Sequence, residues 1–153
     1  MPYGPTVFAA VFAALYAAHQ VADHWIQTDH QAGHKGLPGW AGRLACLAHV
    51  TTYTLTAVIA LIALALSTGL PLSPAHVALG LTISAVTHYI AYRRTPLRRL
   101  ACLTGSAAFF GFGTPRPDRD DKPCLGTGAY ALDQSWHVGW LFVSALAVAS
   151  GVA

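Results

Sequence analysis

Apolar residues fill four long segments of the chain, and few charged residues interrupt them. The segments cover residues about 6–27, 43–67, 74–93 and 129–151. Each is close to the roughly 20 residues that a helix needs to cross the hydrocarbon layer of a membrane. Short breaks rich in glycine and proline separate the first three segments. The pattern predicts an all-α protein, an integral membrane four-helix bundle with antiparallel, up-down neighbours, in one domain over residues 1–153.

The composition supports a membrane protein over a soluble one. Hydrophobic residues make up 54% of the 153 residues and charged residues only 10%, whereas about 25% are charged in an ordinary soluble domain. The three cysteines, Cys46, Cys102 and Cys124, form no CxxC pair, so neither a disulfide framework nor a zinc ribbon is expected. No lysine-rich run with interleaved aromatic residues is present, which argues against nucleic-acid binding.

The basic residues predict how the helices are oriented. Every Lys and Arg lies in or beside the first or the third connection between segments: Lys35, Arg43, Arg93, Arg94, Arg98, Arg99, Arg116, Arg119 and Lys122. With four spanning helices these two connections lie on one side, and the positive-inside rule places that side in the cytoplasm. We therefore expect both termini outside and a cytoplasmic loop over about 94–128. Beyond the lipid bilayer itself, Arg93, Arg94, Arg98 and Arg99 are expected to contact anionic lipids.

Ionisable residues recur inside the apolar segments, where they are costly and usually functional. Four of the eight histidines fall one apiece in the four segments, and two of these four have an aspartate one helical turn away, on the same helix face. The six residues are His19, Asp23, His49, His88, Asp133 and His137. In the up-down order all six fall near the cytoplasmic edge, within about two helical turns of one another in depth. The sequence therefore predicts one shared polar site.

Three interpretations of this site remain open from the residues alone. Imidazole and carboxylate ligands from four helices could bind a divalent transition metal such as zinc, manganese or iron. Alternatively, His–Asp pairs could satisfy one another by hydrogen bonds and lock the helices together without a metal. A third alternative is a b-type haem held by histidines of facing helices, although the nearby aspartates argue against it because haem pockets are usually apolar.

The other histidines and the aromatic residues have simpler expected roles. His24, His30, His34 and His76 are expected to be solvated or interfacial. Aromatic residues cluster near the edge where the polar site is expected, as in a membrane-interface belt: Trp25, Trp40, Tyr89, Tyr92, Tyr130, Trp136 and Trp140. The alternative for some of them is a place in the core of the bundle.

Two motifs carry a resemblance to a known family. They are His19-x-x-x-Asp23-x-x-x-Gln27 and Asp133-Gln134-x-x-His137, accompanied by single histidines in the second and third segments. The pattern resembles a family of small multipass membrane proteins of bacteria and phages that is classed as a domain of unknown function. The resemblance implies a bacterial inner (plasma) membrane location and no particular activity. In that family an Asp commonly follows the third-segment histidine by three residues, whereas Ala91 stands there in this chain, which argues against a two-metal site.

Two classes of function fit these observations, so the sequence leaves open whether the protein is an enzyme. A bound metal could support hydrolysis of a lipid-like substrate, with Asp23 and Asp133 as the catalytic candidates, acting as ligand, orienting partner or general base. The competing class is a non-enzymatic membrane protein, either a metal or proton carrier or an interaction partner in which the cluster is structural. A conducting path within one protomer is disfavoured because the half of the helices away from the cluster is apolar, but a homo-oligomer could form one between protomers.

Overall fold

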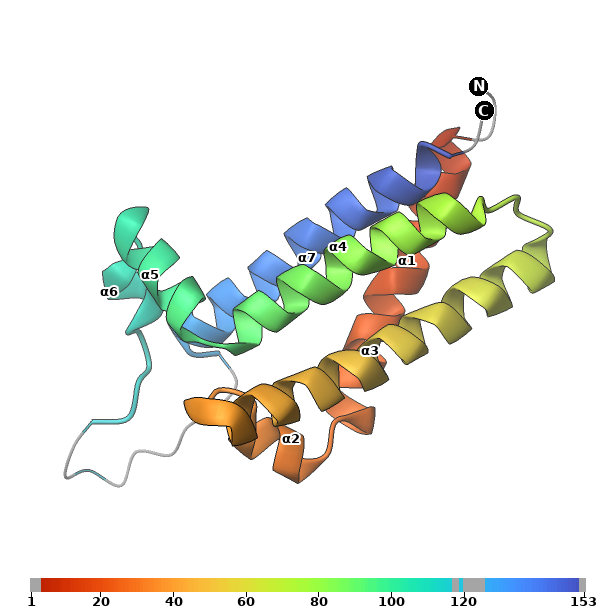
Figure 1. The fold of residues 1–153 in the computed structure, drawn as a ribbon. Coiled ribbons are helices and arrows are strands. Elements are labelled where there is room, and N and C mark those ends of the chain that lie inside the picture. The colour runs from red at the N-terminus through yellow and green to blue at the C-terminus, as the bar shows by residue number, and fades with distance from the viewer. Residues whose placement is uncertain (1–3, 117–118, 120–125, 152–153) are drawn as a thin grey trace.

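Four long helices lie side by side, and shorter helices lie at one end of them (Figure 1). The computed structural model describes residues 4–116, 119 and 126–151. The long helices are α1 (Gly4–Val21), α3 (Gly39–Thr68), α4 (Pro74–Tyr92) and α7 (Gly128–Ala149), and a π-helical turn, η1 (Ala22–Ile26), continues α1. The short helices are α2 (Asp29–His34), α5 (Thr95–Leu103) and α6 (Ala107–Phe110). The described residues include no strand, so the predicted all-α class is confirmed.

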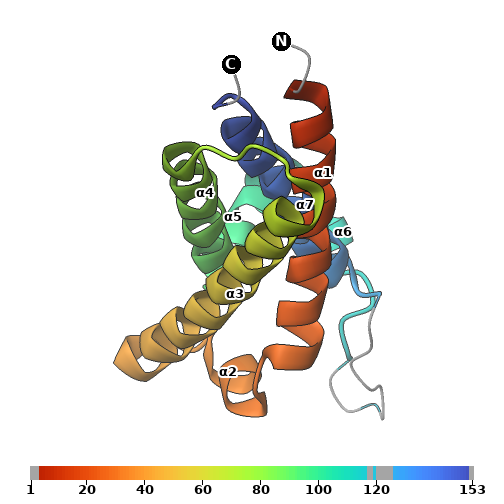
Figure 2. The same ribbon diagram turned by 90° about the vertical axis from the view of Figure 1, so that its right-hand side faces the viewer.

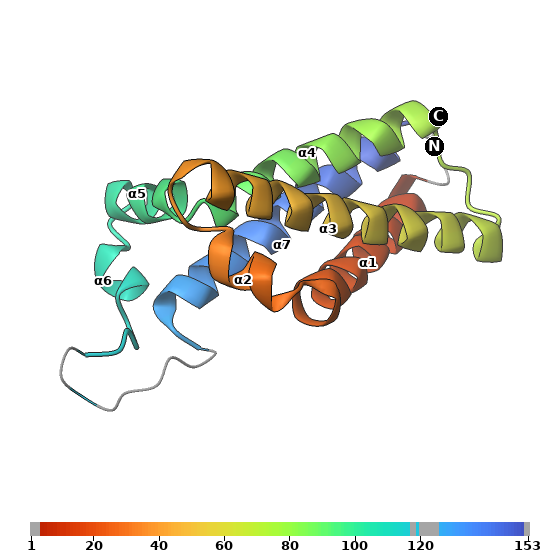
Figure 3. The same ribbon diagram turned by 60° about the horizontal axis from the view of Figure 1, so that its bottom comes forward.

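The long helices contact one another in a closed ring. α1 and α4 each contact both α3 and α7, and α3 is inclined to α1 (Figure 2). α1 and α4 run in one direction along the molecule, and α3 and α7 run in the other (Figure 1). As a result, the first and third connections, with α2, α5 and α6, lie at one end, while the two termini and the α3–α4 turn lie at the other (Figure 3).

The interior changes character from one end of the molecule to the other. The end that holds the termini is filled by buried apolar side chains of α1, α3 and α7: Val7, Val11, Leu15, Ala18, Ala57, Leu61, Leu141, Ala145 and Val148. The buried histidines lie toward the opposite end, in the second half of α1 and α4 and the first half of α3 and α7. The fold therefore places the polar groups beside the first and third connections, above a closed apolar core.

Two helical segments in the described part of the chain, Gly4–Ile26 and Gly39–Thr68, are long and apolar enough to cross a membrane. The sequence predicts four spans. The other two predicted spans correspond to α4, with 19 residues, and α7, with 22 residues. Neither is long and apolar enough to be counted with the first two as a candidate span.

The connections hold more regular structure than the sequence predicts. The first contains α2, which begins with a capping box: Thr28 Oγ1 accepts a hydrogen bond from the backbone N–H of Gln31, and Gln31 Oε1 accepts one from that of Thr28. The region 94–128, expected as a loop, contains α5 and α6. Cys46 and Cys102 are free thiols, whereas Lys122 and Cys124 lie outside the described residues.

Candidate metal centre

The carboxylate of Asp23 lies among three histidines, His19, His49 and His88. Asp23 sits in the π-helical turn that ends the first helix, a geometry that often occurs at functional sites. Its Oδ1 lies 3.3 Å from His49 Nε2 and 3.5 Å from His88 Nε2, and its Oδ2 lies 3.5 Å from His19 Nδ1. The Asp23 side chain is only 5% exposed. Helices α1, α3 and α4 thus deliver their polar side chains to one buried point.

These atoms have the spacing of ligands around one metal ion. His19, Asp23 and His88 each offer a ligand atom, and the three atoms lie within 4.8 Å of one another, so this group could hold a metal. His49 Nε2 lies 3.0 Å from His88 Nε2 and 3.3 Å from Asp23 Oδ1. For comparison, ligands at about 2.0–2.1 Å around a tetrahedral zinc ion are about 3.3 Å apart.

His137 of α7 completes the cluster. Its ring centroid lies 4.8 Å from that of His19 and 4.5 Å from that of His88. Its Nδ1 lies 2.7 Å from the backbone carbonyl of Asp133. Because a carbonyl only accepts, Nδ1 carries the proton of the neutral ring and Nε2 is left with a lone pair. This is the arrangement in which a histidine is oriented to ligate through Nε2.

Several buried polar atoms of the cluster have no hydrogen-bond partner among the described residues. They are both ring nitrogens of His19, Asp23 Oδ1, His49 Nδ1 and His137 Nε2. Buried polar atoms are nearly always paired, and leaving one unpaired costs roughly 1–3 kcal/mol. The His49–His88 and Tyr92–Asp23 hydrogen bonds satisfy part of the cluster, and the atoms left unpaired are imidazole nitrogens and a carboxylate oxygen, which are kinds of atom that ligate metals.

Asp133 occupies a different place from the other expected ligands. Its carboxylate Oδ2 lies 3.5 Å from His137 Nδ1, the same nitrogen that contacts the Asp133 carbonyl, and so on the opposite side of the ring from Nε2. The Asp133 side chain is 20% exposed. It also lines a polar pocket together with Lys35 and Tyr92. The structure thus sets five of the six expected site residues around one point and places Asp133 between that point and the pocket.

Two tyrosines, Tyr92 and Tyr53, belong to the cluster in addition to the predicted histidines and aspartates. The hydroxyl of Tyr92 donates a hydrogen bond to Asp23 Oδ2, so this residue is part of the site and not of an interfacial aromatic belt. The ring of Tyr53 stacks on His88 with centroids 3.8 Å apart, and its hydroxyl lies 2.6 Å from Ser84 Oγ. Both tyrosines follow a cluster histidine by four residues, His88 and His49 respectively, and that spacing is a signal that could have identified them.

Lys35 is a buried cation next to this centre. It is 6% exposed, its Nζ donates a hydrogen bond to Gln27, and Nζ lies 3.1 Å from the centroid of the Tyr92 ring, as in a cation–π contact. Burial lowers the pKa of the Lys35 ammonium to about 8, while the nearby carboxylates of Asp23 and Asp133 act to raise it. A chain of contacts therefore leads from Lys35 through Tyr92 to Asp23.

The remaining histidines of the described segments lie away from the centre. The Nδ1 atoms of His24 and His34 each lie within hydrogen-bond distance of a carbonyl one turn back in their own helices, and both contacts are exposed. His30 stacks on His34, and His76 lies 3.0 Å from Ser73 Oγ at the other end of the molecule. Comparisons with protein-family models, with curated proteins and with solved structures found no match to this chain.

Proposed function

We propose that this chain is an integral membrane protein, a four-helix bundle of the inner membrane that binds one divalent transition metal ion between its helices. Asp23, His49 and His88 are the core ligands, and His19 and His137 supply further imidazoles. The observation that carries the proposal is the triangle of His49 Nε2, His88 Nε2 and Asp23 Oδ1, with sides of 3.0, 3.3 and 3.5 Å. The resemblance to the family of small multipass membrane proteins remains part of the proposal.

The distribution of side chains supports the membrane location. Large apolar residues cover the outer faces of the long helices while the histidines are inside: Leu44, Leu47, Leu55, Ile59, Ile62, Leu66, Leu79, Val86, Phe142, Val143 and Leu146 are all more than a third exposed. Soluble monomers rarely expose so much contiguous apolar surface. An apolar exterior around a polar interior is what lipid favours. The basic connections then face the cytoplasm under the positive-inside rule.

The unpaired atoms and the ring contacts of the cluster favour a metal ion over a purely structural cluster and over a b-type haem. A purely structural set of His–Asp pairs would leave its buried atoms paired, but five of them lack partners within the described chain. A b-type haem has imidazoles on the two faces of its macrocycle, whereas His137 is in direct ring contact with both His19 and His88. Zinc, manganese and iron all suit imidazole and carboxylate ligands.

Hydrolysis is the reaction class that this site supports best. A bound metal lowers the pKa of its water and polarises an ester or phosphoryl oxygen. Asp133 lies 3.5 Å from His137 Nδ1 and lines the adjoining pocket, so it is our candidate for the proton acceptor on the pocket side of the centre. The apolar core at the opposite end, which includes Val11, Leu61 and Leu141, closes the interior of one protomer and disfavours a carrier.

Elemental analysis of protein purified in detergent without a metal-affinity tag tests the proposal. Wild-type protein should hold about one equivalent of metal, and a His49→Ala, His88→Ala variant should hold much less, while a His30→Ala, His34→Ala variant should match wild type because those rings are exposed. An absorption spectrum of the same sample reports haem. Metal-free wild-type protein after reconstitution with zinc, manganese or iron would refute the metal centre.

A further inference from the structure

A basic pocket lies beside the metal centre, where α4 turns into α5. Its volume is about 530 Å³, and its charged lining residues are Lys35, Arg94, Arg98 and Asp133. Three cations therefore face one carboxylate. Tyr92 forms part of the pocket wall, and its hydroxyl donates a hydrogen bond to Asp23 Oδ2. One side chain thus separates the pocket from the centre.

Two of the three cations of this pocket, Lys35 and Arg94, pack closely against neighbouring residues. Lys35 is buried against the Tyr92 ring. Arg94 packs on Gly36 so closely that a Cβ atom there would lie 2.7 Å from Arg94 Nε. Arg98 lies on the first turns of α5, whose backbone N–H groups add partial positive charge. The neighbouring Arg93 does not line the pocket. Its guanidinium donates hydrogen bonds to the backbone carbonyls of Lys35 and Leu37.

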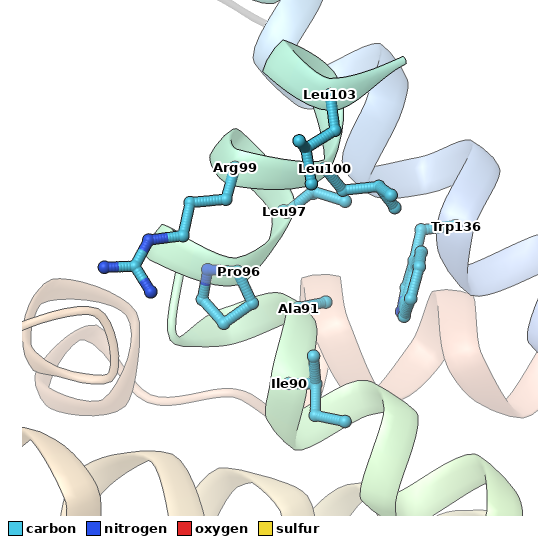
Figure 4. Close-up of a pocket in the computed structure, with 8 residues that line it drawn as sticks. All are labelled: Ile90, Ala91, Pro96, Leu97, Arg99, Leu100, Leu103 and Trp136. Carbon is cyan, nitrogen blue, oxygen red and sulfur yellow. The ribbon is translucent and has the colours of Figure 1, made fainter.

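An apolar pocket of about 360 Å³ adjoins the basic one. Ala91 and Leu97 line both pockets. Figure 4 shows Trp136 standing across the apolar pocket from α5, with the Arg99 guanidinium directed away from it. Trp136 is fixed by a hydrogen bond of 3.1 Å from its Nε1 to the carbonyl of Thr87. Leu103 lines this pocket and is 85% exposed, so the pocket reaches the outer surface of the helices.

We infer that the two pockets together bind one anionic phospholipid, with its phosphate among Lys35, Arg94 and Arg98 and an acyl chain against Leu100 and Trp136. Charge complementarity selects the phosphate, and the adjoining apolar lining selects an amphiphile over a free anion. The inference rests on the membrane location in the proposed function but not on the metal. It names the substrate class of the proposed hydrolysis, because a phosphate in this pocket lies one side chain away from Asp23.

Quenching of Trp136 by brominated lipids tests this inference at the site itself. The chain has four tryptophans, so a Trp25→Phe, Trp40→Phe, Trp140→Phe background leaves Trp136 as the reporter. This protein is placed in phosphatidylcholine vesicles that contain increasing fractions of brominated phosphatidic acid or, in parallel, brominated phosphatidylcholine. The ratio of the two quenching curves gives the preference of the site for the anionic lipid.

We expect a preference of about fivefold or more for phosphatidic acid, reduced about fivefold by Arg94→Gln or Arg98→Gln, since a basic residue near a membrane surface contributes about that factor. Arg43→Gln is the matched control, because Arg43 is a basic residue at the same end of the molecule that does not line either pocket. It should leave the preference unchanged.

Three results would overturn the inference: equal quenching by both lipids, an equal loss in Arg43→Gln, or loss of the preference on adding millimolar inorganic phosphate, which would identify a site for soluble anions. Metal content measured on the same samples separates this inference from the proposed metal centre. Metal-free protein that keeps the lipid preference refutes the centre alone, whereas metal-loaded protein without the preference refutes the lipid site alone.

Discussion

Replacing Asp23 with Asn should abolish most of the metal affinity while leaving the helices assembled. The amide has the size of the carboxylate but no negative charge, and Asp23 is the residue that approaches His19, His49 and His88 together. Loss of a group that only orients a ligand typically costs 10- to 100-fold in metal affinity, so loss of a ligand should cost at least about 100-fold, or about 2.7 kcal/mol. The ligand atoms of Asp23, His49 and His88 lie 3.0–3.5 Å apart, close to the spacing of about 3.3 Å around a tetrahedral ion.

Metal titration of the apo protein in detergent, with a competing chelator, measures this change directly. Asp29→Asn is the matched control, because Asp29 is an exposed carboxylate in the first turn of α2, and its affinity should equal that of wild type. Helix content by circular dichroism checks that the variant remains folded. An Asp23→Asn protein that binds metal as tightly as wild type would refute the assignment of Asp23 as a ligand.

Three further predictions follow from burial and packing. Because burial lowers the pKa of Lys35 from 10.5 to about 8, the folded chain releases this proton at lower pH than the unfolded chain, and the free energy of unfolding should rise between these two values by up to about 3 kcal/mol relative to Lys35→Met; a constant difference across this range, measured by denaturation in detergent, would contradict it. Gly80→Ala should destabilise the protein by roughly 1–3 kcal/mol, because a Cβ at Gly80 would lie 2.8 Å from the carbonyl oxygen of Ser144. Gly139→Ala is the control: its Cβ meets no atom within 4 Å, so the melting midpoint should stay the same or rise slightly, since Ala is the better helix former. Asp133→Asn should retain the metal and lose hydrolysis of phosphatidic acid, and unchanged turnover would exclude Asp133 as the base.

Much of the candidate metal site could be predicted from spacing along the sequence. His19 and Asp23 lie on one helix face because they are four residues apart, and the same holds for Asp133 and His137. An up-down order of four helices then brings His49 and His88 to the same depth, and the structure places both within 3.5 Å of Asp23. Periodicity and helix order are local and directional properties, so the sequence carries them directly.

The sequence could not assign roles within the cluster. Asp23 and Asp133 have the same spacing from a histidine, yet Asp23 is surrounded by three imidazoles while Asp133 lies beside one, that of His137, and lines the pocket. The rotation of each helix about its axis decides this difference, and that rotation depends on how all side chains of the interface pack.

Taken by itself, the sequence determined that the chain is helical and that its histidines and aspartates share helix faces, because those features depend on residues within one or two turns of each other. Only the tertiary structure decided which side chains meet. It buried Lys35, a residue of a polar connection, against Tyr92 of α4, and it joined the basic turn of α5 to Trp136 of α7 in adjoining pockets. These contacts connect residues far apart in the chain, and they are fixed by the packing of whole helices and not by any local pattern.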